Sequence, residues 1–154
     1  MWQSHSQTRL IAWADLRKQC KSEPDLDTAI NTIHNWWQHA PLVLHYLHWD
    51  LVKDWPDPWD LIAENTYCDL AKCLGISYTI LMLDRTDIND LSIQETKEND
   101  YIVSLNQGKY ILNWAPGEVL NINLNTSCIG GCSVLWNTTS TYDTLFVNSQ
   151  GGYY

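Results

Sequence analysis

The chain has 154 residues, a length that fits one domain with a self-supporting core. Its formal net charge is −9, and its nine Lys and Arg residues are scattered along the sequence. Nucleic-acid binding and polybasic membrane anchoring both need clustered basic residues. The composition therefore argues against a nucleic acid or a membrane as a direct partner.

The beginning of the chain lacks the apolar stretch of a secretory signal peptide, and no run of residues approaches transmembrane length. We therefore expect a protein synthesised in the cytoplasm, where its five cysteines stay reduced. An odd number of cysteines leaves at least one thiol unpaired. A local Cys128–Cys132 disulfide is expected only if the chain meets an oxidising environment.

Large aromatic residues dominate the apolar composition, with nine Trp and eight Tyr against one Phe. Such rings bury much area and need a polar partner for their N–H or O–H groups. They form either a tryptophan-packed core or a surface that stacks on a ligand or a neighbouring protein. We expect a core, in which Trp36, Trp37 and Trp59 pack helices together.

The first quarter of the chain predicts two helices. Ser4 to Gln7 resembles a capping box, and apolar residues then recur at helical spacing, which predicts a helix near 6–20. Asp25 or a neighbour can cap a second helix, whose apolar stripe ends at Trp36 and Trp37. Proline cannot continue a helix interior, so Pro41 interrupts the chain, and we expect short helical turns over 42–54.

A third predicted helix leads into a predicted strand. Asp57 is a plausible N-cap and Pro58 a favourable first helical residue, because its missing N–H would be unpaired there anyway. The apolar stripe continues to Leu74, and Gly75 resembles the glycine that ends a helix. The apolar run over 76–83 predicts a buried strand.

The rest of the chain predicts a β-sheet. Residues 84–100 are polar and acidic and indicate a loop or a short helix. Strands over 101–105 and 109–114 flank Asn106–Gly108 and predict a hairpin. Further strands are expected over 119–124, 133–136 and 144–148. We predict a single α+β domain over 1–154 in which N-terminal helices, over 1–75, pack on a C-terminal, mostly antiparallel β-sheet, over 76–154.

Cys68 is the first candidate for a catalytic nucleophile. Cysteine catalysis needs a thiolate, usually at a helix N-terminus or beside a protonated histidine. The predicted helix places Cys68 near its middle, on the buried face, where no substrate can approach. We therefore expect Cys68 to be a packing residue and predict no catalytic residues.

Metal and carboxylate sites are weakly indicated. His45 and His48 are three residues apart and could share a helical face, but no further ligand sits at a recognised spacing. Four aspartates, Asp50, Asp54, Asp57 and Asp60, cluster among the tryptophans and suggest either glycoside chemistry or helix-start electrostatics, of which we expect the latter. We expect no metal, no cofactor and no small-molecule ligand.

The segment from Cys68 through Leu-Gly75-Ile to Ile80 resembles the helix-to-strand step of transglutaminase-like domains. In that family the catalytic cysteine begins the helix, and the corresponding place here falls near Trp59 and Asp60. The family also needs a histidine and an aspartate on following strands, whereas no histidine follows His48. The resemblance implies the fold without the catalytic triad.

The tryptophan-rich string over about 33–83 resembles small uncharacterised proteins of tailed bacteriophages, including cyanophages, which implies a virion component. Uncharged strands after residue 110 also favour partners, because such edges lack the lysines that prevent edge pairing. We expect a non-enzymatic structural subunit of the tail, baseplate or neck that binds other protein subunits. The partner-binding residues predicted are Trp114, Trp136, Phe146, Tyr153 and Tyr154.

Two alternatives stay open at the level of the sequence. One is a transglutaminase- or papain-like cysteine enzyme that uses Cys68 with the upstream His48. The other is a module that binds carbohydrate or peptide through exposed tryptophans.

Overall fold

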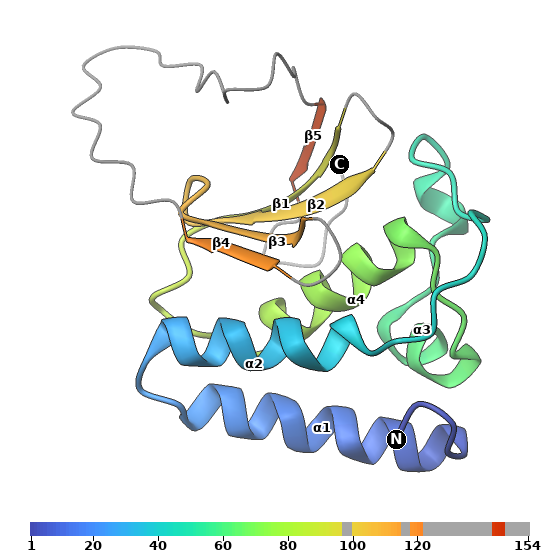
Figure 1. Ribbon diagram of the computed structural model, residues 1–154, viewed down its shortest axis with the longest axis horizontal. Helices are drawn as coiled ribbons and strands as arrows, with labels where there is room; N and C mark the ends of the chain where they lie inside the picture. The colour runs from blue at the N-terminus through green and yellow to red at the C-terminus, as the bar shows by residue number, and fades with distance from the viewer. Residues whose placement is uncertain (97–99, 115–117, 122–142, 147–154) are drawn as a thin grey trace.

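The computed structural model describes residues 1–96, 100–114, 118–121 and 143–146, with residue 114 and the last two ranges described by their backbone alone. In these residues four α-helices come first and a five-stranded antiparallel sheet follows (Figure 1). The predicted α+β class, with N-terminal helices and a C-terminal antiparallel sheet, is confirmed. No helix in these ranges is long and apolar enough to cross a membrane.

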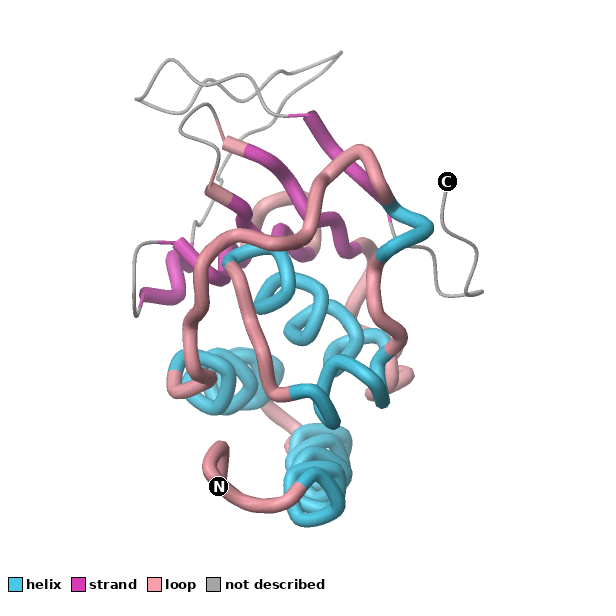
Figure 2. The backbone as a smooth tube through the Cα atoms, turned by 90° about the vertical axis from the view of Figure 1, so that its right-hand side faces the viewer, coloured by secondary structure: helices cyan, strands magenta, loops and turns pink. Residues whose placement is uncertain are grey.

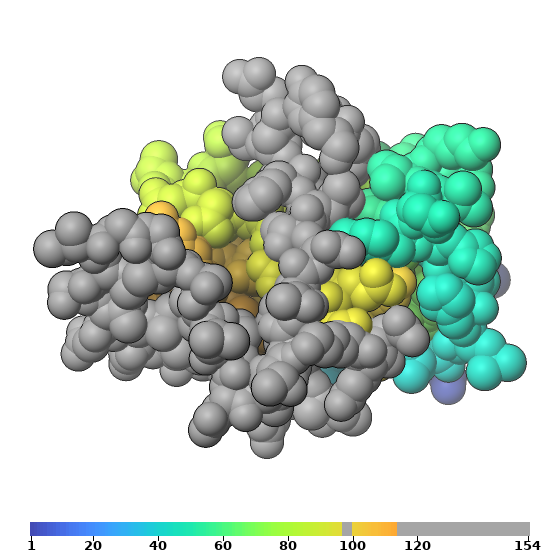
Figure 3. All heavy atoms as spheres, turned by 90° about the horizontal axis from the view of Figure 1, so that it is seen from above, coloured from blue at the N-terminus to red at the C-terminus, as the bar shows by residue number. Residues whose placement is uncertain are grey.

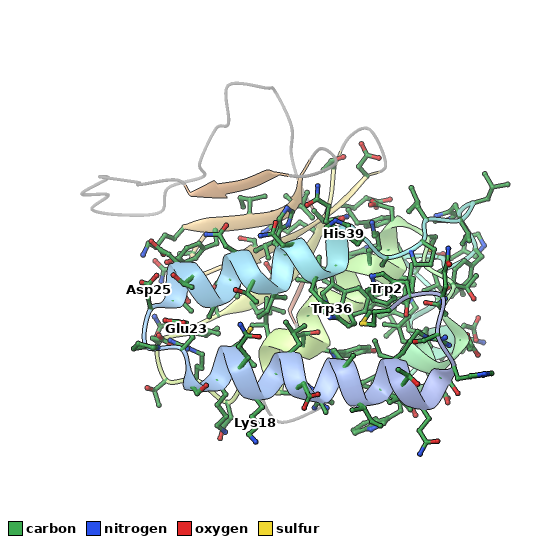
Figure 4. All side chains as sticks on the ribbon, turned by 60° about the horizontal axis from the view of Figure 1, so that its bottom comes forward. Trp2, Lys18, Glu23, Asp25, Trp36 and His39 are labelled. Carbon is green, nitrogen blue, oxygen red and sulfur yellow. The ribbon has the colours of Figure 1, made fainter. Side chains whose placement is uncertain are left out.

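The first two helices, α1 (Ser6–Ser22) and α2 (Leu26–Gln38), confirm the sequence predictions. Asp25 caps α2 as expected, because its carboxylate accepts a hydrogen bond from the Thr28 backbone N–H at 2.9 Å. Glu23 and Asp25 lie together at the turn between the helices (Figure 4). The capping box predicted at Ser4 is wrong, since its hydroxyl donates to the Met1 carbonyl instead.

The predicted helix over 58–74 is in fact two helices. Asp57 caps α3 (Pro58–Glu64) by accepting from the N–H groups of Trp59 and Asp60, both at 2.8 Å. Asn65 then adopts a left-handed backbone conformation, with φ of 55°, and ends the helix. The caps were predicted correctly because they depend on neighbouring residues, whereas the stop at Asn65 was missed.

The next helix, α4 (Asp69–Leu81), replaces the strand predicted over 76–83, so that prediction is wrong. The helix is buried from Leu70 to Ile80 except at Lys72, and a helix buried all round has no polar face to reveal its period. Gly75 does not end a helix either. A Cβ atom at this position would lie 2.1 Å from Cη2 of Trp37, so glycine is required for α2 and α4 to approach each other.

Five strands form the sheet in the order β4-β3-β2-β1-β5, with every neighbouring pair antiparallel. The predicted hairpin is confirmed by β2 (Tyr101–Leu105) and β3 (Tyr110–Trp114), whose turn holds three residues at positive φ, Asn106, Gln107 and Gly108. The strands predicted near 119–124 and 144–148 correspond to β4 (Glu118–Asn121) and β5 (Asp143–Phe146). The strand predicted over 133–136 lies outside the described residues.

The prediction of a loop or short helix over 84–100 is wrong, because this segment contains β1 (Leu91–Glu95). Leu91, Ser92 and Ile93 are all buried, and β1 pairs with β2 on one side and β5 on the other. The strand was not predicted because it contains polar residues. A strand inside a sheet can bury small polar side chains, whereas a periodicity test assigns them to the exposed face.

The elements form layers. Helices α2 and α4 lie against one face of the sheet, while α1 packs on α2 and α3 away from the sheet (Figures 1 and 2). Because α4 contacts α2, α3 and three strands, it occupies the centre of the core. This position explains why nearly all of its side chains are buried.

Tryptophans join the helical layers. The indole N–H groups of Trp13 on α1 and Trp37 on α2 both donate to the hydroxyl of Thr79 on α4, at 2.8 and 2.9 Å. Trp2 packs beside Trp36, with ring centroids 4.3 Å apart (Figure 4). The predicted tryptophan core is thus present, except that Trp59 is 54% exposed and touches Trp13 only at its edge.

Candidate functional site

The most distinctive surface feature is a loop rich in exposed apolar residues, 41–51, which we call the apolar loop. It connects α2 to η1 (Val52–Asp54), a single 3₁₀ turn, and crosses in front of α4 in the view of Figure 2. Only that last turn agrees with the short helical turns predicted over 42–54. The chain around the apolar loop gathers at one side of the molecule (Figure 3).

Exposure of apolar side chains is concentrated in this loop. Leu44 is 91% exposed and Leu42 is 66% exposed, values that are unusual for leucine. Among the described residues eight large apolar side chains are exposed, and five of them belong to the apolar loop: Leu42, Val43, Leu44, Tyr46 and Leu51. Scattered exposed apolar residues are normal, but contiguous ones mark interaction surfaces.

The apolar loop is held in place by specific contacts at both ends. Near its start, the Val43 N–H donates to the Tyr67 carbonyl at 2.9 Å and the Tyr46 hydroxyl donates to the Thr66 carbonyl at 2.7 Å. Further along, Leu47 is buried and the Trp49 ring stacks on Tyr101 of β2 at 5.5 Å between centroids. The exposed side chains are therefore presented by a loop anchored to the core.

The region around the apolar loop is acidic. Residues 41–64 carry five carboxylates and one lysine, Lys53. The carboxylate of Asp57 is occupied in capping α3. The other four are exposed and form no ion pair within the described part of the chain: Asp50, Asp54, Asp60 and Glu64.

The arginines, in contrast, are engaged inside the molecule. Arg9 is buried and donates to the Ile62 and Ala63 carbonyls at the end of α3, at 3.0 and 2.6 Å. Arg85 donates to the Cys20 carbonyl near the end of α1 at 2.9 Å and forms an ion pair with Asp87 at 2.6 Å.

The third arginine, Arg17, lies with its guanidinium 3.9 Å from the centre of a Trp13 ring. Arginines that cap helix ends and stack on an indole contribute little free positive charge to the surface. The described surface is therefore dominated by carboxylates.

Cys68 does not lie where the sequence predicted. It is the N-cap of α4 rather than a mid-helix residue, because the helix predicted over 58–74 breaks at Asn65. A helix N-terminus is where catalytic cysteines often sit. The side chain is nevertheless fully buried, as the prediction of a packing role required.

His48 and Cys68, the pair of the enzyme alternative, form no hydrogen bond or ion pair with each other among the described residues. The His48 ring instead meets His45 edge-on with centroids 5.4 Å apart, and its carbonyl accepts from the Trp55 indole at 3.0 Å. In the described ranges, no three His, Cys, Asp or Glu side chains lie close enough together to hold a metal ion.

A polar cluster does exist beside Cys68, where α4 meets the sheet. The carboxylate of Asp69 accepts from the Tyr101 N–H and from the Asn113 side-chain amide, both at 2.6 Å. Asn113 also donates to the Tyr101 carbonyl at 2.9 Å and to Sγ of Cys73 at 3.3 Å. Asn113 has a φ of 61° at an irregularity in the β3–β4 pairing, which brings its side chain to this position.

This cluster is suited to fixing α4 on the sheet rather than to catalysis. Burial raises the pKa of Asp69 above its usual value, against the opposing effect of its two hydrogen bonds. Burial also raises the pKa of the Cys73 thiol well above its ordinary value, and that of Cys20 to about 11. Thiols with raised pKa values are poor nucleophiles at neutral pH.

The partner-binding residues predicted in the C-terminal half fall where side chains are not described. Trp114 belongs to β3 and Phe146 to β5, each placed by its backbone. Trp136, Tyr153 and Tyr154 lie outside the described residues, as does the Cys128–Cys132 pair. The apolar loop was not predicted, although one signal was present: the apolar run Leu42–Leu44 directly after Pro41, which cannot continue the preceding helix.

Comparisons with known proteins add no assignment. No protein-family model, curated protein or solved structure matches this chain significantly. The class that the fold and the site define is an α+β protein with an anchored apolar loop on an acidic surface.

Proposed function

We propose that this chain is a non-enzymatic subunit that binds a neighbouring protein of a larger assembly through the apolar loop. The observation that carries the proposal is the exposure of five neighbouring apolar side chains on one anchored loop. Keeping leucines in water is unfavourable by about 25 cal/mol per Å² of apolar area, so a covering partner gains stability there.

The burial of every cysteine in the described part of the chain supports a binding role over the cysteine-enzyme alternative. Cys20, Cys68 and Cys73, the three cysteines of the described ranges, are all buried. Cys68 and His48 form no hydrogen bond with each other there, so the apolar loop is the stronger candidate for function.

The proposed setting is a tailed-bacteriophage particle, in the tail, baseplate or neck. This part of the proposal rests on the sequence resemblance over about 33–83. It is tested by mass spectrometry of purified particles from the source of the gene, in which the chain should appear in fixed ratio to known particle proteins. Its absence from the particles would leave the binding role standing and remove the setting.

The binding role is tested with a photo-crosslinking amino acid at position 44 of the full chain, produced in its natural cellular setting. Leu44 is the most exposed residue of the apolar loop, so a bound neighbour must lie within reach of it. We expect one discrete crosslinked protein. The matched control is position 11, because Ile11 is also apolar and 57% exposed but lies on α1. Equal crosslinking at the two positions contradicts the proposal.

A further inference from the structure

The backbone of the apolar loop is open along much of its length. Leu42 forms one parallel bridge with Tyr67, so the loop begins as an extended segment beside it. Beyond the Val43 N–H, however, the backbone N–H groups of residues 44–48 have no hydrogen-bond partner among the described residues, and of these five residues only Leu47 is buried. Backbone N–H groups left unpaired beside such a bridge are a template on which another chain can add as a strand.

The side chains of the same segment fit an apolar occupant. In strand addition the backbone hydrogen bonds supply affinity and the flanking side chains supply selectivity. All residues from 41 to 46 are exposed, and Leu42, Leu44 and Tyr46 occupy every second position among them. Side chains alternate across an extended chain, so an incoming strand with apolar residues at every second position meets apolar surface.

The charge around the apolar loop indicates which residues should lie between the apolar residues of the partner segment. The exposed carboxylates Asp50, Asp54, Asp60 and Glu64 lie within the apolar loop or follow it in sequence. Burial raises the pKa of the Tyr46 hydroxyl to about 12, and the nearby Cys68 and Glu64 add to this effect, which places Glu64 near the loop. The arginines of this chain are turned inward. Lysine or arginine side chains on a partner therefore find uncompensated carboxylates.

We propose that residues 42–48 receive an extended segment of another protein in which apolar residues alternate with Lys or Arg, by strand addition. This inference rests on the proposed function and names the chemistry of its partner. A second copy of the chain fits less well, because both surfaces would carry the same acidic surroundings and each chain has a net charge of −9. An anionic membrane surface is disfavoured for the same reason.

The test measures binding of a fluorescein-labelled synthetic peptide of alternating lysine and valine to the full chain by fluorescence anisotropy. Two matched peptides separate the two parts of the proposal. One keeps its sequence but has methylated central amides, and the other replaces every lysine by glutamate. We expect each change to weaken binding by about tenfold or more, because the first removes strand pairing and the second reverses the charge.

The protein variant Leu42→Ser/Leu44→Ser should weaken binding of the lysine–valine peptide by about tenfold, whereas Ile11→Ser should leave it unchanged. Both variants change exposed residues, so both should keep the thermal unfolding midpoint of the parent chain. Equal binding of the methylated peptide, or of the glutamate peptide, overturns the inference.

Two other outcomes also overturn it in favour of a different occupant. One is self-association in analytical ultracentrifugation that is lost on Leu42→Ser/Leu44→Ser. The other is flotation with phosphatidylcholine vesicles that is lost on the same change. A discrete crosslink at position 44 together with failure of the peptide tests would preserve the proposed function and reject the strand-addition inference.

Discussion

At the scale of single residues, Thr79 joins three helices through one hydroxyl. Its oxygen accepts from the indoles of Trp13 and Trp37 and its hydrogen is donated to the Gly75 carbonyl at 2.7 Å. Trp13, Trp37 and Thr79 are all fully or almost fully buried. A buried N–H left without an acceptor costs about 1–3 kcal/mol. The Thr79 oxygen therefore removes this cost for two indole N–H groups at once.

We predict that Thr79→Val lowers the free energy of unfolding by about 2–4 kcal/mol, since valine keeps the shape but removes the acceptor of both indoles. Chemical denaturation measures the loss. The control is Ser77→Ala on the same helix: the Ser77 hydroxyl is buried without a hydrogen-bond partner among the described residues, so its removal should be neutral or stabilising. The idea fails if Thr79→Val is no more destabilising than Ser77→Ala.

At the scale of the elements, the contact between α2 and α4 depends on the missing side chain at Gly75. In an exposed helix, replacing glycine by alanine stabilises by about 1 kcal/mol. Here the added methyl group would overlap the six-membered ring of Trp37, with separations of 2.1 to 2.5 Å from three of its carbon atoms.

We predict that Gly75→Ala reverses that sign and lowers the free energy of unfolding by about 3 kcal/mol or more, because the Trp37 ring must leave its place and its bond to Thr79. Trp37→Phe should remove part of the clash, so the double variant should cost clearly less than the sum of the two single changes. Thermal or denaturant unfolding of all three variants checks this. Strict additivity would show that the overlap does not control the packing.

The same elements show which parts of the fold could be predicted from the sequence. The caps at Asp25 and Asp57 were predicted correctly because an N-cap involves residues adjacent in the chain. The helical structure of α4 was not predicted, because burial on all sides removes its hydrophobic periodicity. The role of Gly75 was not predicted either, because it depends on Trp37, which is far away in sequence. In the candidate site, the apolar character of residues 42–51 was visible, but their exposure depends on what the rest of the chain leaves uncovered.

At the scale of the whole molecule, the distribution of charge follows from how the helices end. Arg9 and Arg85 satisfy carbonyl groups at the ends of α3 and α1, where cations are favoured by the helix dipole. Both cations are therefore engaged in holding the helical layer together. The surface retains the excess of carboxylates, and the apolar loop lies among them.

The helical layer and the sheet are joined at Asp69, which makes their attachment sensitive to pH. Burial raises the pKa of Asp69 above its ordinary value, so the folded chain holds this proton more tightly than the unfolded chain does. The stability contributed by that proton is fully present below the unfolded pKa and is lost as the pH rises through the folded pKa.

We therefore predict that the stability of the parent chain relative to Asp69→Asn decreases as the pH rises from below about 4 towards neutrality, since the variant cannot titrate at this position. Asp87 contributes to stability with the opposite pH dependence, because its hydrogen bond with Arg85 lowers its pKa. Comparing the two chains at each pH cancels this contribution, since both chains contain Asp87. Urea unfolding across this pH range provides the measurement. A stability difference that stays constant, or that grows with pH, would mean that the hydrogen bonds from Tyr101 and Asn113 outweigh the burial of the carboxylate.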